Sequence, residues 1–356
     1  MMIFGSPSRY IQGPGLLSKL GAELARISDN AVLIIDPIVE KLWGNTIDTS
    51  CKDAGISLTM LAFGGESSPE EIDRLMAKVG RPSVVAAAGG GKCIDAGKAM
   101  ANRLDALVVT IPTVASTDAP TSHNYVLYNT DHLMLRVEKL RRNPDLVIVD
   151  TDVLVRAPKH MFVSGIGDAI GKIYEVEACA HNDGINVFGG KSAWTARILA
   201  SACHDILLNH AEDALAAIDQ GLTTPTFEKV IEATVLMSGL AFESGGLSIS
   251  HSMTRGLSAA APWKDRLHGY QVAYANLIQL TLENRPEAEI RNLMTFYKRV
   301  GLPRSLRELG GVIPEAATFE TVARLTMTAP HVSHFPRSLQ ATDIEQAMRH
   351  IEALDN

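Results

Sequence analysis

Three consecutive glycines mark the part of the sequence best suited to binding an anionic ligand. Gly89-Gly90-Gly91 follows the apolar run Ser83–Ala88, which is typical of a buried strand, and precedes a predicted helix that contains Ile94 and Asp95. Glycine lets the backbone approach a ligand closely, and the N–H groups at a helix N-terminus favour anions such as a pyrophosphate. The run is neither a Walker A loop, because residue 86 is Ala, nor G-x-G-x-x-G, because residue 94 is Ile. A simple tight turn is the alternative.

Two polar features follow other strand-like runs. Asp36 ends the run Ala31–Asp36, where a carboxylate could accept a hydrogen bond from a ribose 2′-OH and favour NAD over NADP. Alternatively, Asp36 forms a turn before Pro37. Five hydroxyls and Asp118 lie within Thr113–Ser122, after another strand. They could bind phosphates, a nicotinamide amide or a substrate hydroxyl, because ligands of open α/β sheets bind at the carboxyl ends of strands. An ordinary loop with local side-chain-to-backbone bonds is the alternative.

Candidate metal ligands lie further along the chain. Asp168 stands in Gly165–Ala169 at the predicted start of a helix, where its simplest role is that of an N-cap. His251 and His268 are separated by an interval that matches no compact zinc signature. If the three converge, two imidazoles and one carboxylate suit Zn²⁺ or Fe²⁺ and leave coordination positions open for a substrate. Ligands on separate helices leave no local signal, so spacing alone does not establish the site.

The elements that must position these residues differ between the two halves of the chain. Short apolar runs alternate with helical segments up to residue 158, which predicts an α/β domain (1–158) with a parallel sheet. The rest (159–356) is expected to be all-helical, and a cleft between two domains is a common place for a small-molecule site. The predicted strands are Ala31–Asp36, Ser57–Phe63, Ser83–Ala88, Ala106–Ile111 and Leu146–Asp150. Predicted helix starts are Ser68-Pro69, Thr224-Pro225 and a capping box at Thr342–Glu345.

The composition excludes several classes of protein. The 356 residues are 46% hydrophobic and 21% charged, with a net charge of −7. This composition argues against disorder, and the longest basic run, Lys139–Arg142, is too short to predict a nucleic-acid partner. The four cysteines include no C-x-x-C pair, which favours a reducing compartment. We see no signal peptide and no apolar run of about 18 residues, so a cytoplasmic location away from membranes is expected.

Six stretches taken in order resemble the glycerol dehydrogenase family, within the iron-containing alcohol dehydrogenase and dehydroquinate synthase-like superfamily. Two of them, STDAPTS and FESGGL, are more specific to glycerol dehydrogenases than to the wider superfamily. The stretches are GGGKCIDAGKAMA (89–101), IPTVASTDAPTS (111–122), NPDLVIVDT (143–151), GIGDAIGKIYE (165–175), FESGGLSISH (242–251) and LHGYQVAY (267–274).

The resemblance implies roles for individual residues. Asp168, His251 and His268 resemble the ligands of a catalytic Zn²⁺, with Fe²⁺ as the alternative, and Asp118 resembles a substrate contact. The residues that resemble the family's NAD contacts are Asp36, Gly90, Gly91, Lys92, Asp95, Thr113, Ser116, Ser122, Asn124 and Tyr128. The resemblance also implies a homo-oligomer, typically an octamer.

Three departures from the family pattern leave the substrate open. Thr254 replaces the usual His one turn after His251, Tyr270-Gln271 replaces the usual Glu-Lys, and His123-Asn124-Tyr125 replaces apolar residues. We expect hydride transfer between NAD and a small polyol or vicinal diol, with Asp118, water or His123 as proton acceptor. The alternatives are a dehydroquinate synthase-like lyase, a glycerol-1-phosphate dehydrogenase or another sugar-phosphate enzyme, and a non-catalytic nucleotide-binding relative.

Overall fold

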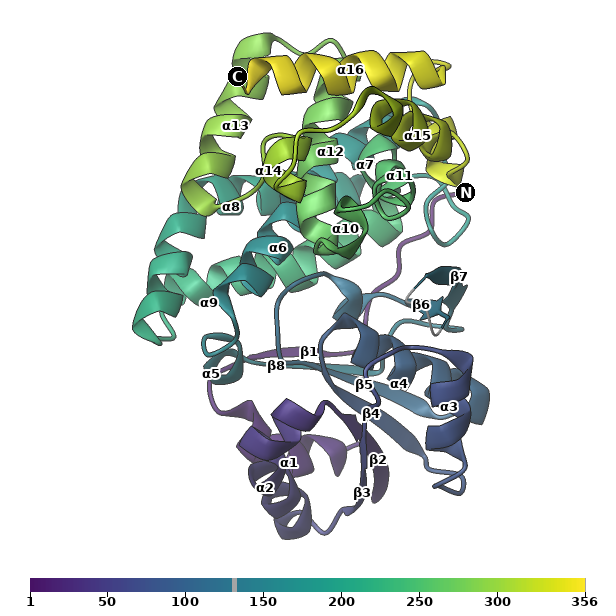
Figure 1. The fold of residues 1–356 in the computed structure, drawn as a ribbon. Coiled ribbons are helices and arrows are strands. Elements are labelled where there is room, and N and C mark those ends of the chain that lie inside the picture. The colour runs from purple at the N-terminus through teal and green to yellow at the C-terminus, as the bar shows by residue number, and fades with distance from the viewer. Residues whose placement is uncertain (130–132, 356) are drawn as a thin grey trace. The chain divides into compact units, whose positions relative to one another are not determined.

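The computed structural model describes residues 1–129 and 133–355, which divide into two compact units (Figure 1). The sheet unit comprises residues 6–158 and 217–236. The helical unit comprises residues 1–5, 159–216 and the chain from 237 onward. One boundary therefore falls at residue 158, while two short segments, 1–5 and 217–236, each join the unit formed mainly by the other half of the chain.

The sheet unit is built on six parallel strands in the order β1-β8-β5-β4-β2-β3, and β6 and β7 form a separate antiparallel pair. The strands are β1 (Tyr10–Gly13), β2 (Asn30–Ile35), β3 (Ser57–Ala62), β4 (Val84–Gly89), β5 (Leu107–Pro112), β6 (Asn124–Tyr128), β7 (Met134–Lys139) and β8 (Leu146–Asp150). The five predicted strands are confirmed to within one residue at each end. The sequence pattern missed β1, which is only half-buried, and β6 and β7, which lie outside the main sheet.

Helices cover both faces of this sheet, as Figure 1 shows. Alternate residues of β2 face opposite sides: Leu33 and Ile35 pack in the core with α1 and α2, and Val32 and Ile34 pack in the core with α3 and α4. The helices are α1 (Leu20–Leu24), α2 (Pro37–Asp53), α3 (Pro69–Met76), α4 (Gly91–Leu104), α5 (Thr151–Leu154) and α9 (Pro225–Ile231), with 3₁₀ turns at Leu16–Lys19 and Ala119–Thr121 and a π-helical turn at Glu232–Met237. Continuous apolar runs therefore predicted a doubly covered sheet correctly, except that β3 is an exposed edge strand.

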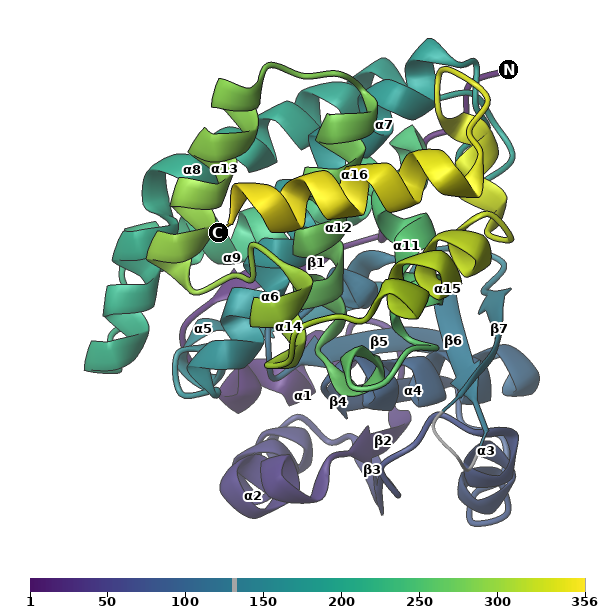
Figure 2. The same cartoon turned by 45° about the horizontal axis from the view of Figure 1, so that its top comes forward.

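The helical unit is organised around α12, which is buried along most of its length and packs against α6, α11, α13 and α16 (Figure 2). Its helices are α6 (Lys159–Ile170), α7 (Lys172–His181), α8 (Trp194–Gln220), α10 (Ser238–Gly245), α11 (Ile249–Leu257), α12 (His268–Leu282), α13 (Glu287–Val300), α14 (Leu306–Gly310), α15 (Ala316–Thr326) and α16 (Ala341–Leu354), with 3₁₀ turns at Trp263–Asp265 and Pro330–His334. The predicted helical character of this half is confirmed.

Two of the three predicted helix starts are confirmed. Ser68 caps α3 and Thr224 caps α9, each accepting a hydrogen bond from a backbone N–H three residues later. The capping box of α16 was predicted two residues too late. It is formed by Gln340 and Asp343, because the Asp343 carboxylate accepts a hydrogen bond from the Gln340 backbone N–H at 2.7 Å.

Among the described residues, no single helix is long and apolar enough to cross a membrane. One pair of helical segments, Pro225–Gly245 and Ile249–Leu257, meets the length and composition criteria only when the two are taken together, across a bend of 101°. Most residues of this pair are buried within the protein.

Candidate active site

The glycine turn joins β4 to α4 in the sheet unit. The helix begins at Gly91 and contains Ile94 and Asp95, as predicted, and among the described residues no side chain caps its N-terminus at Gly90. A Cβ atom on Gly89 would lie 2.6 Å from the Cys93 Cβ, and one on Gly97 would lie 2.5 Å from the Ala87 Cβ. Side chains at these positions would therefore push α4 away from β4. A helix N-terminus without a side-chain cap suits the anionic pyrophosphate of a dinucleotide.

Asp36 lies beside this turn, because β2 and β4 are neighbours in the sheet. Its carboxylate caps α2 by accepting a hydrogen bond from the Ile38 backbone N–H at 2.9 Å. Its own N–H donates to the Ala88 carbonyl, and its Cβ lies 3.4 Å from where a Cβ on Gly89 would be. Asp36 therefore caps a helix that begins at Pro37 and does not form the turn considered as its alternative role. Its carboxylate is also next to the proposed pyrophosphate site.

The polar loop after β5 lies against the same turn. The Thr113 N–H donates to the Gly89 carbonyl at 3.1 Å, and Thr117 is the side chain that a Cβ on Gly91 would meet first, at 3.7 Å. Thr121 and Ser122 make local bonds to backbone carbonyls, as the loop alternative predicted. Ser116 is half-buried and Asp118 is buried.

A buried lysine that the sequence did not single out holds this loop in place. The Lys98 ammonium donates to the carbonyls of Ala119 at 2.6 Å and Asn124 at 2.9 Å, and to the Ser122 hydroxyl at 3.3 Å. Within residues 1–129 and 133–355, the Asn124 side-chain oxygen is buried and has no hydrogen-bond partner. A buried polar atom of this kind fits a ligand that donates to it.

Lys92, Asp95 and Tyr128 gather at the first turn of α4. The Lys92 ammonium lies 2.6 Å from Glu66 and 4.8 Å from the centre of the Tyr128 ring. Burial raises the pKa of Asp95 from its ordinary 3.8 to about 6, and the positive charge of Lys98 limits the rise. The cofactor residues implied by the resemblance therefore lie together in one unit, around one helix N-terminus.

The three candidate metal ligands converge in the helical unit. Asp168, His251 and His268 come from α6, α11 and α12, and their ligand atoms all lie within 4.8 Å of one another. The Asp168 Oδ1 atom is 3.3 Å from the His251 Nε2 atom and 3.8 Å from the His268 Nε2 atom. The Asp168 side chain is buried, whereas that of His268 is 42% exposed. A carboxylate and two imidazoles at this separation fit a divalent metal ion.

Close packing of α6 on α12 explains how distant residues meet. Asp168 lies inside α6, so the expectation that it caps a helix N-terminus was wrong. Gly167 of α6 and Gly269 of α12 let the two helices approach closely: a Cβ on Gly167 would be 2.4 Å from the Gly269 carbonyl, and a Cβ on Gly269 would be 1.7 Å from the Ser164 carbonyl. This contact places Asp168 next to His268.

Glu175 on α7 orients His251 and was not among the predicted site residues. Its Oε2 atom lies 2.5 Å from the His251 Nδ1 atom, and its Oε1 atom accepts from the N–H groups of Ser248 and His251, each at 2.9 Å. Nδ1–H therefore donates to Glu175, which leaves Nε2 to bind a metal. Burial opposes ionisation of Glu175, but the neighbouring His251 and Lys172 lower its pKa to about 2.

Lys172 places a positive charge among the ligand atoms. Its ammonium lies 2.7 Å from the Asp168 Oδ1 atom and 3.1 Å from the His251 Nε2 atom, and it is almost completely buried. Burial alone would raise the pKa of Asp168, but Lys172, with His251 and His268, holds that pKa well below its ordinary value. The only sequence signal for Glu175 and Lys172 was their presence in the GIGDAIGKIYE stretch.

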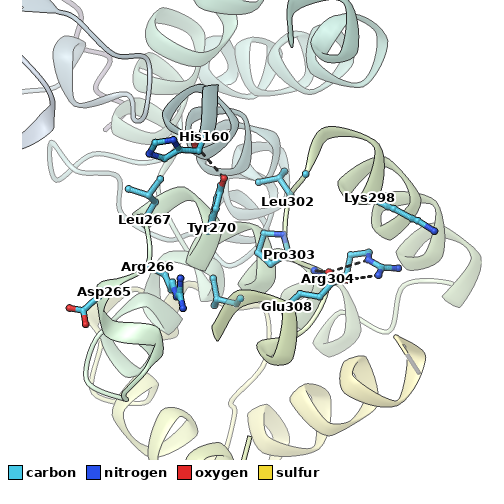
Figure 3. Close-up of a pocket in the computed structure, with 12 residues that line it drawn as sticks. His160, Asp265, Arg266, Leu267, Tyr270, Lys298, Leu302, Pro303, Arg304 and Glu308 are labelled. Carbon is cyan, nitrogen blue, oxygen red and sulfur yellow. Dashed lines mark hydrogen bonds and ion pairs between the residues drawn. The ribbon is translucent and has the colours of Figure 1, made fainter. Parts of the chain in front are cut away.

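The residues that depart from the family pattern have largely structural partners. The Thr254 hydroxyl donates to the His251 carbonyl at 2.7 Å, Gln271 donates to the Trp263 carbonyl at 2.9 Å, and Tyr125 donates to Glu138 at 2.7 Å. Tyr270 instead lines a cavity of about 470 Å³ in the helical unit, and its hydroxyl donates to the His160 carbonyl at 3.4 Å (Figure 3). His123 is buried.

Comparison with known proteins gives a consistent result. Residues 7–151 match the family model described as iron-containing alcohol dehydrogenase. A glycerol dehydrogenase from Escherichia coli is 38% identical over 86% of this chain and 84% of its own, and a glycolaldehyde reductase from Halobacterium salinarum is 36% identical over 93% and 92%. A solved glycerol dehydrogenase from Schizosaccharomyces pombe superposes with a TM-score of 0.95 at 32% identity, covering 99% of this chain and 91% of its own. The chain belongs to the glycerol dehydrogenase family of iron-containing alcohol dehydrogenases.

Proposed function

We propose that this protein is an NAD-dependent, divalent-metal-dependent dehydrogenase that oxidises one hydroxyl of a small polyol or vicinal diol, as in the conversion of glycerol to dihydroxyacetone. The observation that carries the proposal is the convergence of Asp168, His251 and His268 from three helices. Family membership supports the oxidoreductase class, and the donor set supports the metal.

Three protein ligands suit a catalytic rather than a structural metal, because they leave coordination positions open for substrate oxygens. A bound Zn²⁺ or Fe²⁺ would lower the pKa of a substrate hydroxyl toward neutrality, so that the hydroxyl could lose its proton near pH 7. In this proposal Asp168, His251 and His268 hold the ion. Glu175 would hold His251 in the orientation that frees Nε2 for this role, through the hydrogen bond to Nδ1.

The sheet unit would bind NAD, which supplies the hydride acceptor. The N-terminus of α4 at Gly90 and Gly91 would hold the pyrophosphate, and Asp36 would accept a hydrogen bond from the ribose. Among the residues that the structure describes, support comes from the missing side-chain cap of α4, from the position of Asp36 beside the turn, and from the unpartnered Asn124 oxygen. The other proposed contacts are Lys92, Asp95, Thr113, Ser116, Ser122 and Tyr128.

The substrate is assigned by chemical class. Both sequence relatives described above are named for small molecules that carry hydroxyl groups on neighbouring carbons or beside a carbonyl. This favours a small polyol over the sugar phosphate of a dehydroquinate synthase-like lyase or a glycerol-1-phosphate dehydrogenase, and it favours an enzyme over a non-catalytic relative. Asp118 would bind a substrate hydroxyl, and the proton would leave through Asp118, His123 or water.

The direct test is NADH formation with a panel of diols, polyols, hydroxy acids and sugar phosphates, each with added zinc and with a chelator. We expect absorbance to rise with one or more unphosphorylated vicinal diols and to stop rising with the chelator. Turnover of sugar phosphates alone, or no turnover despite bound metal and NAD, would contradict the proposal. By resemblance we also propose that the protein is cytoplasmic and forms a homo-octamer. A molar mass equal to that of one chain, measured by light scattering, would refute the octamer.

A further inference from the structure

The Lys172 ammonium occupies a position that competes with a metal ion. It contacts two of the three proposed ligand atoms, Asp168 Oδ1 at 2.7 Å and His251 Nε2 at 3.1 Å. The Phe242 ring lies 5.4 Å away. Only 1% of the lysine side chain is exposed, so the ammonium cannot be solvated by bulk water where it lies.

The chemistry of His251 makes the two cations mutually exclusive. An ammonium has three donors and no acceptor, so its contact with Nε2 uses the single lone pair of that nitrogen. Because Nδ1–H donates to Glu175, Nε2 is also the atom through which His251 would bind a metal. One lone pair can accept a hydrogen bond from Lys172 or bind a metal, and it cannot do both.

The charge of the Asp168 carboxylate also makes binding of Lys172 and binding of a metal mutually exclusive. A buried carboxylate without a counter-ion is strongly destabilising, and Lys172 supplies that counter-ion at 2.7 Å. A divalent ion bonded to Asp168 would lie at about 2.0–2.2 Å from its oxygen. The ammonium would then be left beside a second, larger positive charge in a buried site, where repulsion is strong.

We propose that Lys172 sets the metal affinity of this site: its ammonium holds the ligand side chains together in the metal-free protein and must leave His251 before the metal binds. This inference rests on the proposed metal site at Asp168, His251 and His268. It predicts that removing the ammonium tightens metal binding and destabilises the metal-free protein.

The first experiment measures Zn²⁺ affinity by competition with a chromophoric chelator. We expect Lys172→Met to bind Zn²⁺ about 10- to 100-fold more tightly than the wild type, the range typical of groups that contact metal ligands. Lys172→Arg keeps the positive charge and should bind no more tightly than the wild type. Lys191→Met is the matched control, because it removes a surface lysine that pairs with Asp183 at 2.7 Å in the same unit, and it should match the wild type within about twofold.

Thermal unfolding gives a second readout from the same proteins. Added zinc should raise the melting temperature of Lys172→Met more than that of the wild type or Lys191→Met, because only the lysine variant lacks a cation at Asp168 before zinc is added. The proposal would be overturned if Lys172→Met bound zinc no more tightly than the wild type and if added zinc raised the melting temperature of both proteins equally.

A crystal structure of the zinc-loaded wild type keeps the inference testable if Lys172→Met does not fold. We expect the Lys172 ammonium to lie beyond hydrogen-bond distance of the His251 Nε2 atom once zinc is bound. Zinc on all three ligands with the ammonium still bonded to Nε2 would refute the role of Lys172 and leave the metal site intact. Zinc bound by none of the proteins would refute both the metal site and this inference.

Discussion

The cofactor region of the sheet unit and the metal cluster of the helical unit are assembled in opposite ways. The proposed NAD contacts are carried by the segments that directly follow β2, β4 and β5, three adjacent parallel strands, except for Asn124 and Tyr128, which lie on β6. The proposed metal ligands come from α6, α11 and α12, and they meet because Gly167 and Gly269 allow two helices to touch backbone to backbone. The first site depends on local backbone chemistry, whereas the second depends on packing between distant segments.

A substitution at His251 should have the largest effect on the metal cluster and should leave the fold of the sheet unit unchanged. His251→Ala should abolish metal binding and lower turnover by roughly a thousandfold or more, since a Lewis-acidic metal supplies several kcal/mol of transition-state stabilisation. Metal content by elemental analysis and NADH formation should fall together while NAD binding persists. His350→Ala, at an exposed histidine of α16, is the control and should keep both. Full activity of His251→Ala would contradict the metal's role.

How far the sequence predicted each region follows from the same difference. Apolar runs predicted five of the strands, and Gly89–Gly91 indicated the turn between β4 and α4, because both signals are contiguous. Asp168, His251 and His268 were assigned by resemblance alone, since no spacing rule connects three separate helices. Glu175, Lys172 and Lys98 were missed because their roles arise only from contacts with residues far away in the chain or on another element.

Asp95 tests the cofactor region through stability and pH. Burial raises its pKa from 3.8 to about 6 in the folded protein, so the folded state binds more protons than the unfolded state between these values. The contribution of Asp95 to stability is therefore highest below pH 3.8, falls as the pH rises to about 6, and is level above that. Asp95→Asn should remove this fall and raise the free energy of unfolding at pH 8 by about 3 kcal/mol relative to the wild type.

Denaturant unfolding of the wild type and Asp95→Asn between pH 4 and 8 measures this effect. Asp73→Asn, which changes an exposed carboxylate paired with Arg103, controls for the loss of one charge. A difference between wild type and Asp95→Asn that stays constant across this pH range would show that Asp95 is not held at a raised pKa.

Glu175 tests whether the metal cluster depends on contacts beyond its three ligands. Glu175→Gln keeps an oxygen for the N–H groups of Ser248 and His251 but removes the charge beside His251 Nδ1. We expect Zn²⁺ affinity to fall by about 10- to 100-fold. Competition with a chelator measures it, and Glu177→Gln, whose carboxylate pairs with Arg197 at 2.6 Å, is the control. Unchanged affinity in Glu175→Gln would mean that this hydrogen bond does not orient the ligand.

Asp36 separates the local and the ligand-binding role of one residue in the cofactor region. Asp36→Ser keeps an oxygen that can cap α2, so the melting temperature should be unchanged. The KM for NAD should rise about tenfold, because a hydrogen bond to a charged group contributes about 1.5 kcal/mol. Asp36→Ala should show the same rise in KM and lose about 1 kcal/mol of stability with the cap. A normal KM in both variants would reduce Asp36 to its capping role.

If the metal cluster of the helical unit makes the polyol oxidation possible, activity must depend on removal and return of the metal. The wild-type protein is stripped with a chelator, dialysed, and titrated with Zn²⁺ or Fe²⁺ while NADH formation from glycerol and other vicinal diols is followed. We expect activity to be lost on stripping and to return in proportion to bound metal, saturating at about one ion per chain, because the three ligands form one site with open positions. Full activity in protein shown by elemental analysis to hold almost no metal would contradict it.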